Sequence, residues 1–409
     1  MSSIVYTEPS EIIEQIADGS VLILPGGCTE PTAFYAALSA GIGRFSDLKL
    51  FSGLQFGPYS FLDRGLGTHF SYTTWHVNGK ARKLARDGLI SYLPVRFSEV
   101  GNAFPHQDVL VIQTGPPNNG KVNLGVSVSM NLELLKDAKC VIAEVTDQMP
   151  VTCGESVIST DQIDYFIHGN TDLSEVARPE PGALEVEIAK RVLTLIPEGA
   201  CVQLGIGGVP ESLIAMLAGR KDIRLHTGMV TDGFIPFLEQ SDHQVTIAEV
   251  FGTRQIFDYV NNNPQIELRA ASYTHSPTVI GANPKFTSIN SALEIDLMGQ
   301  VNAEAVNGKP VAGIGGSLDF FEGAARSDGG RAVIALASTA GGGKHSRIVT
   351  QLAAGAPVTI PRYMVHTVVT EHGIAELRGK SLHDRAIALA HVADPKFRDD
   401  LMEAANQVP

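Results

Sequence analysis

Two segments of this 409-residue chain repeat the same order of parts, and this repeat constrains the fold more than any other feature. Each segment reads as a helix, a turn, an apolar strand, a glycine-rich loop and a second helix. The turn falls at Gly19 or Gly199, and the second helix opens at Pro31 or Pro210. A repeat of this size implies two related α/β halves, although convergence on a common βα pattern would produce the same likeness. The two copies are Glu11–Gly41 and Glu187–Gly219.

The pattern of the first half supports two α/β domains in tandem. Short apolar runs alternate with helical segments, which predicts a mostly parallel sheet covered by helices. The polar linker Thr171–Pro181 immediately precedes the second copy, so we place the boundary there. The predicted domains are residues 1–178 and 179–409, and the length of the chain suits two domains. The predicted strands of the first half are Leu48–Ser52, Leu89–Tyr92, Val109–Gln113 and Cys140–Val145.

Charge and cysteine usage narrow the class of protein. The formal net charge of −13 argues against nucleic acid or anionic lipid as a partner, so an anionic ligand would be held locally. The N-terminus lacks the regions of a signal peptide, and no apolar run reaches the length of about 18 residues that a membrane helix needs. We therefore expect a soluble, cytoplasmic protein without a metal site or a disulfide framework, because its cysteines lack the spacing for either. These cysteines are Cys28, Cys140, Cys153 and Cys201.

One carboxylate lies near the end of a run that otherwise reads as a buried strand. Two β-type runs, Ile223–Thr227 and Gln244–Val250, are each followed by a glycine, which predicts strand ends that open onto a cleft rather than pass straight into a helix. The second run carries Glu249 near its end. A carboxylate in such a place has a perturbed pKa or a chemical function. The alternative is a structural role, as the cap of a neighbouring loop or the partner of Arg254.

The second half also contains three glycine-rich loops, each after an apolar run. Loops of this kind expose backbone N–H groups to an anion. Neither GxGxxG nor GxxxxGK[ST] occurs, so a dinucleotide or nucleoside triphosphate is not supported. A GIGG sequence on its own is more often a tight turn than a ligand site. The loops are Gly205–Gly208, Gly313–Gly316 and Gly341–Lys344.

A series of longer motifs follows a characteristic order along the chain: AEVTDQMPVTCGESVISTDQIDYFI, QLGIGGVPESL, FGTRQIFDYVNNNP, INSALEIDLMGQVNAE, GIGGSLDFFEGA, ALASTAGGGKHSRIV and VHTVVTEHGIAELRGKSLHDRA. The series resembles the acetyl-CoA hydrolase/transferase family of the family I CoA-transferases, whose members act on 4-hydroxybutyrate, butyrate, acetate and succinate. The resemblance covers most of Ala143–Arg398, whereas the residues before it match loosely. It implies two NagB-like, Rossmann-like α/β domains with mostly parallel sheets, usually in a homodimer.

The resemblance also implies a reaction. In this family a glutamate carboxylate attacks an acyl-CoA thioester and forms a mixed anhydride and then a glutamyl-CoA thioester, which a second carboxylic acid resolves. Acyl-CoA and a small carboxylic acid are therefore the expected partners, with no permanently bound cofactor. Similar family members read HTEM followed by SDG, and that glutamate is the nucleophile. This chain reads HTGMVTDG, with Gly228 at that position, so we expect Glu249 to be a relocated nucleophile.

The oxyanion hole and the groups around it are assigned by the same motifs. Backbone N–H groups of Gly205, Ile206 and Gly207, and of Gly315 and Gly316, would form the oxyanion hole. The alternative for these glycines is turn formation.

Polar side chains in the later motifs have expected roles of their own. Asn290 would position the acyl carboxylate or the thioester, or act as a capping amide, and Glu371 would orient the site from behind. Lys344 and Arg347 would bind the CoA phosphates, unless they belong to a solvated loop. Ser338 and Thr339, nearby in the sequence, would also take part in CoA binding.

Two other functions remain open at this point. Glu249 could instead act as a general base, which would make the protein an acyl-CoA thioesterase or a CoA-dependent lyase. The chain could also be an inactive CoA-binding homologue. One more carboxylate, Glu30, mirrors Glu211 in the repeat and is expected to cap a helix rather than act on substrate.

Overall fold

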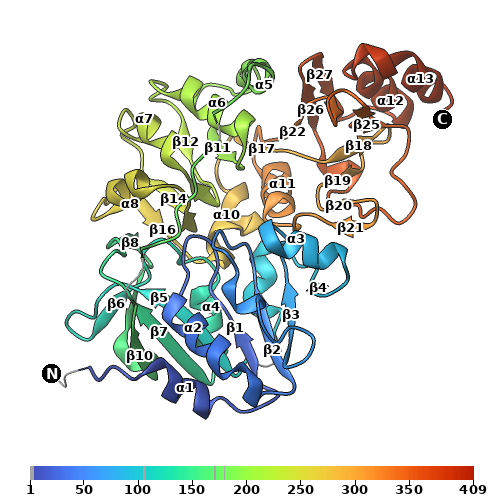
Figure 1. Cartoon of the computed structure of the whole chain (residues 1–409). Coiled ribbons are helices and arrows are strands. Elements are labelled where there is room, and N and C mark those ends of the chain that lie inside the picture. Colours follow the sequence, from blue (N-terminus) through green and yellow to red (C-terminus); the bar gives the residue numbers. More distant parts are fainter. Residues whose placement is uncertain (1–3, 105–106, 170–171, 179) are drawn as a thin grey trace. The chain divides into compact units, whose positions relative to one another are not determined.

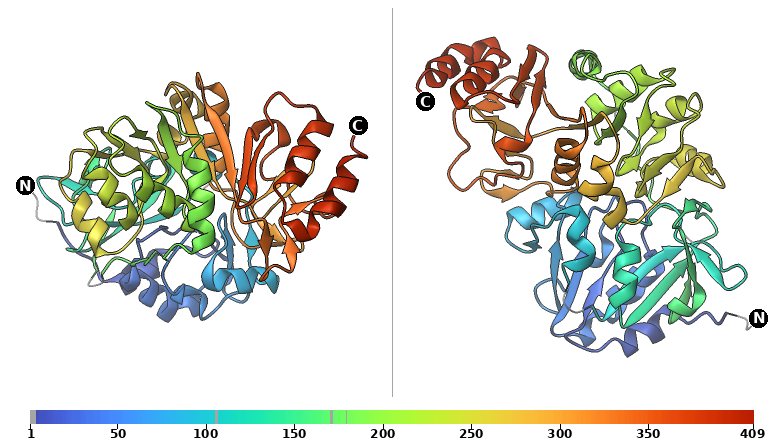
Figure 2. Two further views of the ribbon diagram at one scale, coloured as in Figure 1. Left: turned by 90° about the horizontal axis from the view of Figure 1, so that it is seen from above. Right: turned by 180° about the vertical axis from the view of Figure 1, so that it is seen from behind.

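The computed structural model describes residues 4–104, 107–169, 172–178 and 180–409, and Figures 1 and 2 draw the chain from blue at the N-terminus to red at the C-terminus. Contacts within the chain divide it into two compact units. The chain first passes between them after Ala177, next to the predicted boundary, but two later segments also belong to unit 1. Of the predicted linker, Thr171 and Pro179 lie outside the described residues. Unit 1 is Met1–Ala177, Met229–Asp232 and Thr246–Tyr273, and unit 2 is Arg178–Gly228, Gly233–Val245 and Thr274–Pro409.

Unit 1 is built on a seven-stranded sheet with the order β10-β7-β5-β1-β2-β3-β4, in which every neighbouring pair is parallel. Its strands appear in blue and teal in Figure 1. The predicted mostly parallel α/β architecture is therefore confirmed for this unit. The strands are β1 (Val21–Ile23), β2 (Leu48–Ser52), β3 (Phe70–Thr74), β4 (Ser91–Tyr92), β5 (Val109–Thr114), β7 (Cys140–Val145) and β10 (Tyr165–His168).

Strand β4 begins two residues later than the sequence predicts, and the end of helix α3 (Gly79–Arg86) is the reason. Gly88 has a φ of +74° and donates its N–H to Ala85 at 3.1 Å, while the N–H of Leu89 donates to the carbonyl of Leu84 at 2.9 Å. This pair of bonds is the glycine-dependent motif that closes many helices. Leu89 is thereby used by the helix and is not available to the strand.

The core of unit 1 lies between this sheet and its helices. Strand β5 is buried along its whole length, as its continuous apolar run predicts for a central parallel strand. Helix α2 (Thr32–Gly41) contributes Phe34 and Leu38, which are buried against Leu22 and Leu50 of the sheet. Other helices of the unit are α1 (Pro9–Gln15), α4 (Asn131–Asp137) and α8 (Arg254–Val260).

The predicted run Gln244–Val250 forms two short strands rather than one. Strand β14 (Val245–Ile247) joins a sheet with β16 (Ile266–Leu268) and β8 (Cys153–Gly154), and β15 (Glu249–Val250) pairs with β13 (Met229–Val230). The break falls at Ala248, whose carbonyl accepts the N–H of Ser129 at 3.1 Å. The expectation that this run opens onto a cleft rather than a helix is wrong. Only three residues, Phe251, Gly252 and Thr253, separate β15 from helix α8, which begins at Arg254.

Unit 2 contains a six-stranded sheet with the order β12-β11-β17-β22-β26-β27, parallel except for the last pair. Helix α5 (Ala183–Leu193), strand β11 and helix α6 (Gly208–Leu217) follow the order of α1, β1 and α2 in unit 1. Helix α6 begins at Gly208, two residues before the predicted start. The strands are β11 (Cys201–Leu204), β12 (Arg224–Leu225), β17 (Phe286–Asn290), β22 (Arg331–Ala335), β26 (Thr367–Thr370) and β27 (Gly373–Glu376).

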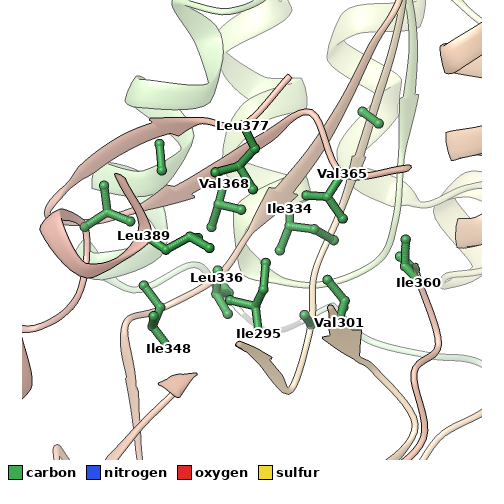
Figure 3. Close-up of a cluster of buried hydrophobic side chains, with 14 of the residues drawn as sticks. Ile295, Val301, Ile334, Leu336, Ile348, Ile360, Val365, Val368, Leu377 and Leu389 are labelled. Atoms are coloured by element: carbon green, nitrogen blue, oxygen red, sulfur yellow. The ribbon is translucent and has the colours of Figure 1, made fainter. Parts of the chain in front are cut away.

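A cluster of buried aliphatic side chains forms the core at the C-terminal side of unit 2. Figure 3 shows Ile334 and Val368 of the sheet close to Leu389 of helix α12 (Leu382–His391), and all three are fully buried. Helix α13 (Pro395–Ala405) lies beside α12 in Figures 1 and 2. None of the helices that the structure describes is long and apolar enough to cross a membrane. The other helices and small strands of unit 2 used below are α11 (Ser317–Arg326), β23 (Thr339–Ala340) and β24 (His345–Ser346).

Candidate functional site

Glu249 lies on β15 in unit 1, held between two other segments of the same unit. Strand β13 pairs with it in parallel and places Met229 opposite Glu249. On the other side, Ser127 forms an antiparallel bridge with Glu249, and Val250 donates its N–H to Val126 at 2.9 Å. Only 6% of the Glu249 surface is exposed. The sequence of unit 1 therefore buries a carboxylate on a strand that has backbone partners on both sides.

Two serine hydroxyls lie beside this carboxylate. The hydroxyl of Ser127 donates to Oε1 of Glu249 at 3.5 Å. The hydroxyl of Ser129 makes no hydrogen bond of normal geometry, but its proximity also lowers the pKa of Glu249. Burial outweighs both hydroxyls and raises the pKa of Glu249 to about 7. The alternative partner, Arg254, instead donates to Asp258 at 2.7 Å.

The loop that carries the two serines is fixed by its own hydrogen bonds. Ser129 has a φ of +33°, which is unfavourable for a residue with a side chain. Its carbonyl accepts the N–H of Ala271, and the carbonyl of Ser127 accepts the side-chain amide of Asn131, both at 2.9 Å. A strained residue that its surroundings hold in place is typical of a functional site.

A buried thiol in the same unit is not a nucleophile. Burial, with smaller contributions from the negative charges of Glu249 and Asp232, raises the pKa of Cys28 to about 12. The thiol is therefore protonated at neutral pH, and a carboxylate is the better nucleophile of this region. No group of His, Cys, Asp and Glu side chains among the described residues is arranged to hold a metal ion.

Unit 2 brings together residues from four motifs at one edge of its sheet. Strands β11, β17, β22 and β26 are parallel neighbours, so their carboxyl ends lie at the same edge. Gly205 follows β11, Asn290 ends β17, Ser338 follows β22, and Glu371 follows β26. In parallel α/β sheets, ligands bind outside this edge.

Asn290 and the first glycine loop are direct neighbours at this edge. The side-chain amide of Asn290 donates to Gln203 and to Ser288, each at 3.0 Å. A Cβ atom at Gly205 would lie 3.5 Å from Oδ1 of Asn290. Gly207 has a φ of +123°, which favours glycine, and it precedes the first residue of α6. The loop therefore leads directly into the N-terminus of α6 and lies beside Asn290. Ile206, between these glycines, is half exposed.

Glu371 and Ser338 form a second pair at the same edge. The backbone N–H and the hydroxyl of Ser338 donate to the Glu371 carboxylate at 2.9 Å and 2.6 Å. Ser338 is fully buried, so its hydroxyl is bonded to Glu371 and is not exposed to a ligand in this structure. Nε2 of His372 lies 3.6 Å from Glu371 and 3.7 Å from Asp394.

The cationic residues lie at and beyond a hairpin tip. Thr339 belongs to β23, which pairs with β24 across the loop Gly341–Lys344. The three glycines of this loop all have left-handed φ values, of 61°, 68° and 80°, and Lys344 at its end is exposed. Arg347 is partly buried and its guanidinium approaches the carbonyl of Ala292 at 3.5 Å.

Sequence reasoning missed a histidine and misassigned a helix cap. Gly228 and Gly316 both face the imidazole of His275, a residue that no motif marks. Glu30 does not cap α2. Instead, the carboxylate of Glu144 accepts the N–H groups of Ala33 and Phe34, at 3.3 Å and 3.0 Å. The pairing joins residues 111 apart in the sequence, so local spacing gives no sign of it.

Together, the fold and these residues define a two-unit, mostly parallel α/β protein with a buried glutamate in one unit and glycine-rich loops at the strand ends of the other. The chain belongs to the acetyl-CoA hydrolase/transferase family. The N-terminal domain of that family matches residues 5–176, and the C-terminal domain matches residues 252–405. Glu249 lies between the two matched segments.

Curated relatives match nearly the whole chain. A 4-hydroxybutyrate coenzyme A transferase of Clostridium kluyveri is 36% identical over 405 residues, which cover 95% of this chain and 94% of that protein. A butyryl-CoA:acetate CoA-transferase of Anaerostipes caccae is 33% identical over 422 residues, covering 97% and 95%.

Solved structures show the same fold. RipA from Yersinia pestis superimposes with a TM-score of 0.92 at 29% identity, over 98% of this chain and 97% of that chain. A 4-hydroxybutyrate CoA-transferase of Porphyromonas gingivalis has a TM-score of 0.84 at 31% identity, with the same coverage of 98% and 97%.

Proposed function

We propose that this chain is an acyl-CoA:carboxylate CoA-transferase that acts on a small carboxylic acid, with Glu249 as the attacking carboxylate. The observation that carries the proposal is the setting of Glu249, which is buried on β15 beside two serine hydroxyls. Burying a carboxylate costs free energy, and carboxylates with raised pKa values are concentrated at functional sites. The family and the curated relatives supply the class of reaction.

The proposed reaction needs no cofactor. A carboxylate oxygen of Glu249 attacks the thioester carbonyl carbon, the carbon–sulfur bond breaks, and the CoA thiolate leaves a mixed anhydride. The thiolate then attacks the Glu249 carbonyl carbon, which releases the first acid and forms a glutamyl-CoA thioester. A second carboxylate reverses these steps and leaves as its CoA ester. The anhydride conserves the acyl-transfer potential, so water must be excluded, and the burial of Glu249 favours this.

The other predicted residues take supporting roles in this proposal. The backbone N–H groups at Gly205–Gly207 and Gly315–Gly316 would stabilise the tetrahedral oxyanion, with Asn290 beside the first loop and Glu371 behind it. Lys344 and Arg347 would bind the CoA phosphates. We also propose a cytoplasmic enzyme, and a homodimer because the family resemblance implies one.

The raised pKa of Glu249 supports a second candidate function. A carboxyl group with a pKa of about 7 is matched to general-base catalysis at neutral pH. Glu249 would then remove a proton from water, and the enzyme would be an acyl-CoA thioesterase. The two functions share the same residue but differ in whether a covalent bond to it forms.

Trapping of the covalent intermediate separates these functions. The protein is incubated with acetyl-, butyryl-, 4-hydroxybutyryl- and succinyl-CoA, treated with borohydride and examined by peptide mass spectrometry. Borohydride reduces a glutamyl-CoA thioester to an alcohol, so we expect a mass change on the peptide that carries Glu249, and none in Glu249→Gln. Glu144→Gln is the matched control, because burial also raises the pKa of Glu144 to about 7.

The remaining outcomes are equally informative. Release of free CoA by an unmarked protein would replace the transferase with a thioesterase. Binding of acyl-CoA without a mark and without turnover would leave a CoA-binding protein. A mark on a different residue would reject Glu249 as the nucleophile.

A further inference from the structure

The same side chain, that of His275, leaves no room for a larger residue at two glycines of unit 2, Gly228 and Gly316. A Cβ atom at Gly228 would lie 3.0 Å from Nε2 and 3.3 Å from Cε1 of His275. A Cβ atom at Gly316 would lie 2.3 Å from Cδ2 and 2.6 Å from Nε2 of the same ring. Gly316 has a φ of −96°, which any residue adopts, so the backbone does not require glycine there. The imidazole itself occupies the side-chain space of both residues.

The ring that fills this space is held on its other sides. Nδ1 of His275 lies 2.9 Å from the hydroxyl of Thr274, which fixes one edge of the ring. The ring of Phe320 packs against it with 4.7 Å between centroids and an angle of 54°. Nε2 of His226 forms a hydrogen bond of 2.7 Å with the carbonyl of Thr274. This bond fixes Thr274, whose hydroxyl contacts the His275 ring. Only 3% of the His275 surface is exposed.

The opposite edge of the imidazole therefore lies between two backbone segments. One is the bend at Gly228, three residues after β12 ends, and the other is the loop Gly315–Gly316 that opens α11. Gly315 has a φ of +61°, a conformation that favours glycine. Because glycine has no side chain, Gly315 makes no side-chain contact that would hold the loop. Besides the N–H of Phe320, which donates to the carbonyl of Gly316, contact with a fixed aromatic ring constrains this loop, because packed interiors leave little room for a backbone to shift.

We propose that His275 is a positioning residue of the CoA-transferase site: its imidazole sets the separation of the bend at Gly228 and the Gly315–Gly316 loop. This inference rests on the proposed function, in which that loop donates N–H groups to the oxyanion. Such donors stabilise the transition state more than bound substrate when their direction is fixed beforehand. Loss of the ring should therefore lower kcat and leave KM nearly unchanged.

Amide side chains of two lengths test which edge of the ring matters. In His275→Asn the amide nitrogen falls near the place of Nδ1, and in His275→Gln it falls near the place of Nε2. We expect Gln to retain kcat within about threefold, whereas Asn and Ala lose roughly ten- to a hundredfold, the scale of a small misplacement of catalytic groups. KM for acyl-CoA should change by less than about twofold in all three.

A double-mutant cycle tests the contact itself. Gly316→Ala places a methyl group where the ring lies, so it should lower kcat on its own. In Gly316→Ala/His275→Ala that collision is gone, and the double variant should be no slower than His275→Ala. Gly43→Ala is the control, because Gly43 is exposed and a Cβ atom there would meet nothing within 4 Å.

The assay distinguishes failure of this inference from failure of the proposed function. A wild-type protein that transfers no CoA to any acid would overturn both. An active wild type whose His275→Ala and His275→Asn variants keep wild-type kcat would overturn the role of His275 alone. A fall in kcat that is the same for Gln, Asn and Ala and follows the loss of thermal stability would also overturn it, since a purely structural residue behaves in that way.

Discussion

The Glu249 carboxyl group has two competing influences on its charge. Burial favours the neutral acid, whereas the hydroxyls of Ser127 and Ser129 favour the carboxylate, and burial is the stronger. The residue is therefore balanced near neutral pH, where both forms are populated. A nucleophile with this property is active only in its ionised fraction.

The pH profile of transfer follows from this balance. We expect kcat/KM for acyl-CoA to rise with pH through about 7, because the ionised carboxylate attacks. Ser127→Ala with Ser129→Ala should move the midpoint upward, since both hydroxyls lower the pKa. Ser156→Ala is the control, because Ser156 is equally buried in unit 1 but bonds Thr152 and Cys153. A midpoint that moves downward would contradict the assignment.

The free energy of unfolding should fall as pH rises, whereas kcat/KM should increase. The pKa of Glu249 rises from 4.5 to about 7 on folding, so between these values the folded state holds a proton that the unfolded state has released. Stability therefore falls as pH rises through this window, and the full cost, up to about 3 kcal/mol, is present above it. Glu249→Gln removes the charge.

Urea unfolding at two pH values measures this cost. The Gln variant should exceed wild type in free energy of unfolding by up to about 3 kcal/mol near pH 8, and by much less near pH 5. A variant whose advantage is larger near pH 5 would show that the carboxylate is stabilised, not penalised, by the fold.

Sequence reasoning could find some of these residues and not others. Glu249 is conspicuous because a charged residue interrupts an apolar run. His275 is not, because Gly228 and Gly316, whose space it fills, lie far from it in the chain and resemble ordinary turn glycines. Contacts between distant residues leave no periodic pattern to read.

At the level of elements, short segments of unit 1 depend on a carboxylate from another part of the chain. Asp232 follows β13 and accepts the N–H of Ile256 at 3.1 Å and the hydroxyl of Thr253 at 2.8 Å, at the start of α8. Strand β13 is thus held to β15 by strand pairing, and Asp232 after it caps the start of helix α8. This is why Met229–Asp232 packs with unit 1 although its sequence neighbours belong to unit 2.

Removal of this cap should destabilise the protein. Asp232→Ala removes the carboxylate that accepts the N–H groups of Thr253 and Ile256, and we expect a loss of about 2 kcal/mol in the free energy of unfolding. Asp232→Asn keeps one acceptor oxygen and should lose less. Chemical denaturation of the three proteins measures the order, and equal stability of Ala and wild type would argue against the cap.

The elements themselves were predictable to different degrees. Strands β2 and β7 have the predicted bounds, because each is a short apolar run between turn residues. The division between β14 and β15 was not predictable, since a hydrogen bond from Ser129 creates it. Local patterns define where strands exist, and distant partners decide where they break.

At the level of the whole molecule, unit 1 is discontinuous in sequence. The segments Met229–Asp232 and Thr246–Tyr273 supply it with β13, β15, β16 and α8. The sequence predicts a single linker as the boundary, because composition reveals a polar linker but not which later strands return to the first unit. Glu249 consequently belongs to unit 1, although the predicted C-terminal region 179–409 contains it.

A fragment ending at the predicted linker tests this organisation. Residues 1–177 lack the strand that pairs with β8 and the strand that bridges to Ser127. Such a fragment leaves apolar surface and strand edges uncovered, so it should unfold without cooperativity or aggregate. Thermal and urea unfolding followed by circular dichroism measures this against the full chain. A cooperative transition at the temperature of the full chain would show that unit 1 is complete by Ala177.

The discontinuity of unit 1 also determines when this unit can fold during synthesis of the chain. Domains generally fold as the chain leaves the ribosome, N-terminal regions first. Here the nascent N-terminal region must wait until Tyr273 has emerged, and by then Arg178–Gly228 of unit 2 is already exposed and lacks most of its own partners. For that interval both sheets are unfinished together. The nascent chain should therefore depend on chaperones most strongly in the middle of its translation, and a pause in translation just after Tyr273 would let unit 1 close before the rest of unit 2 arrives.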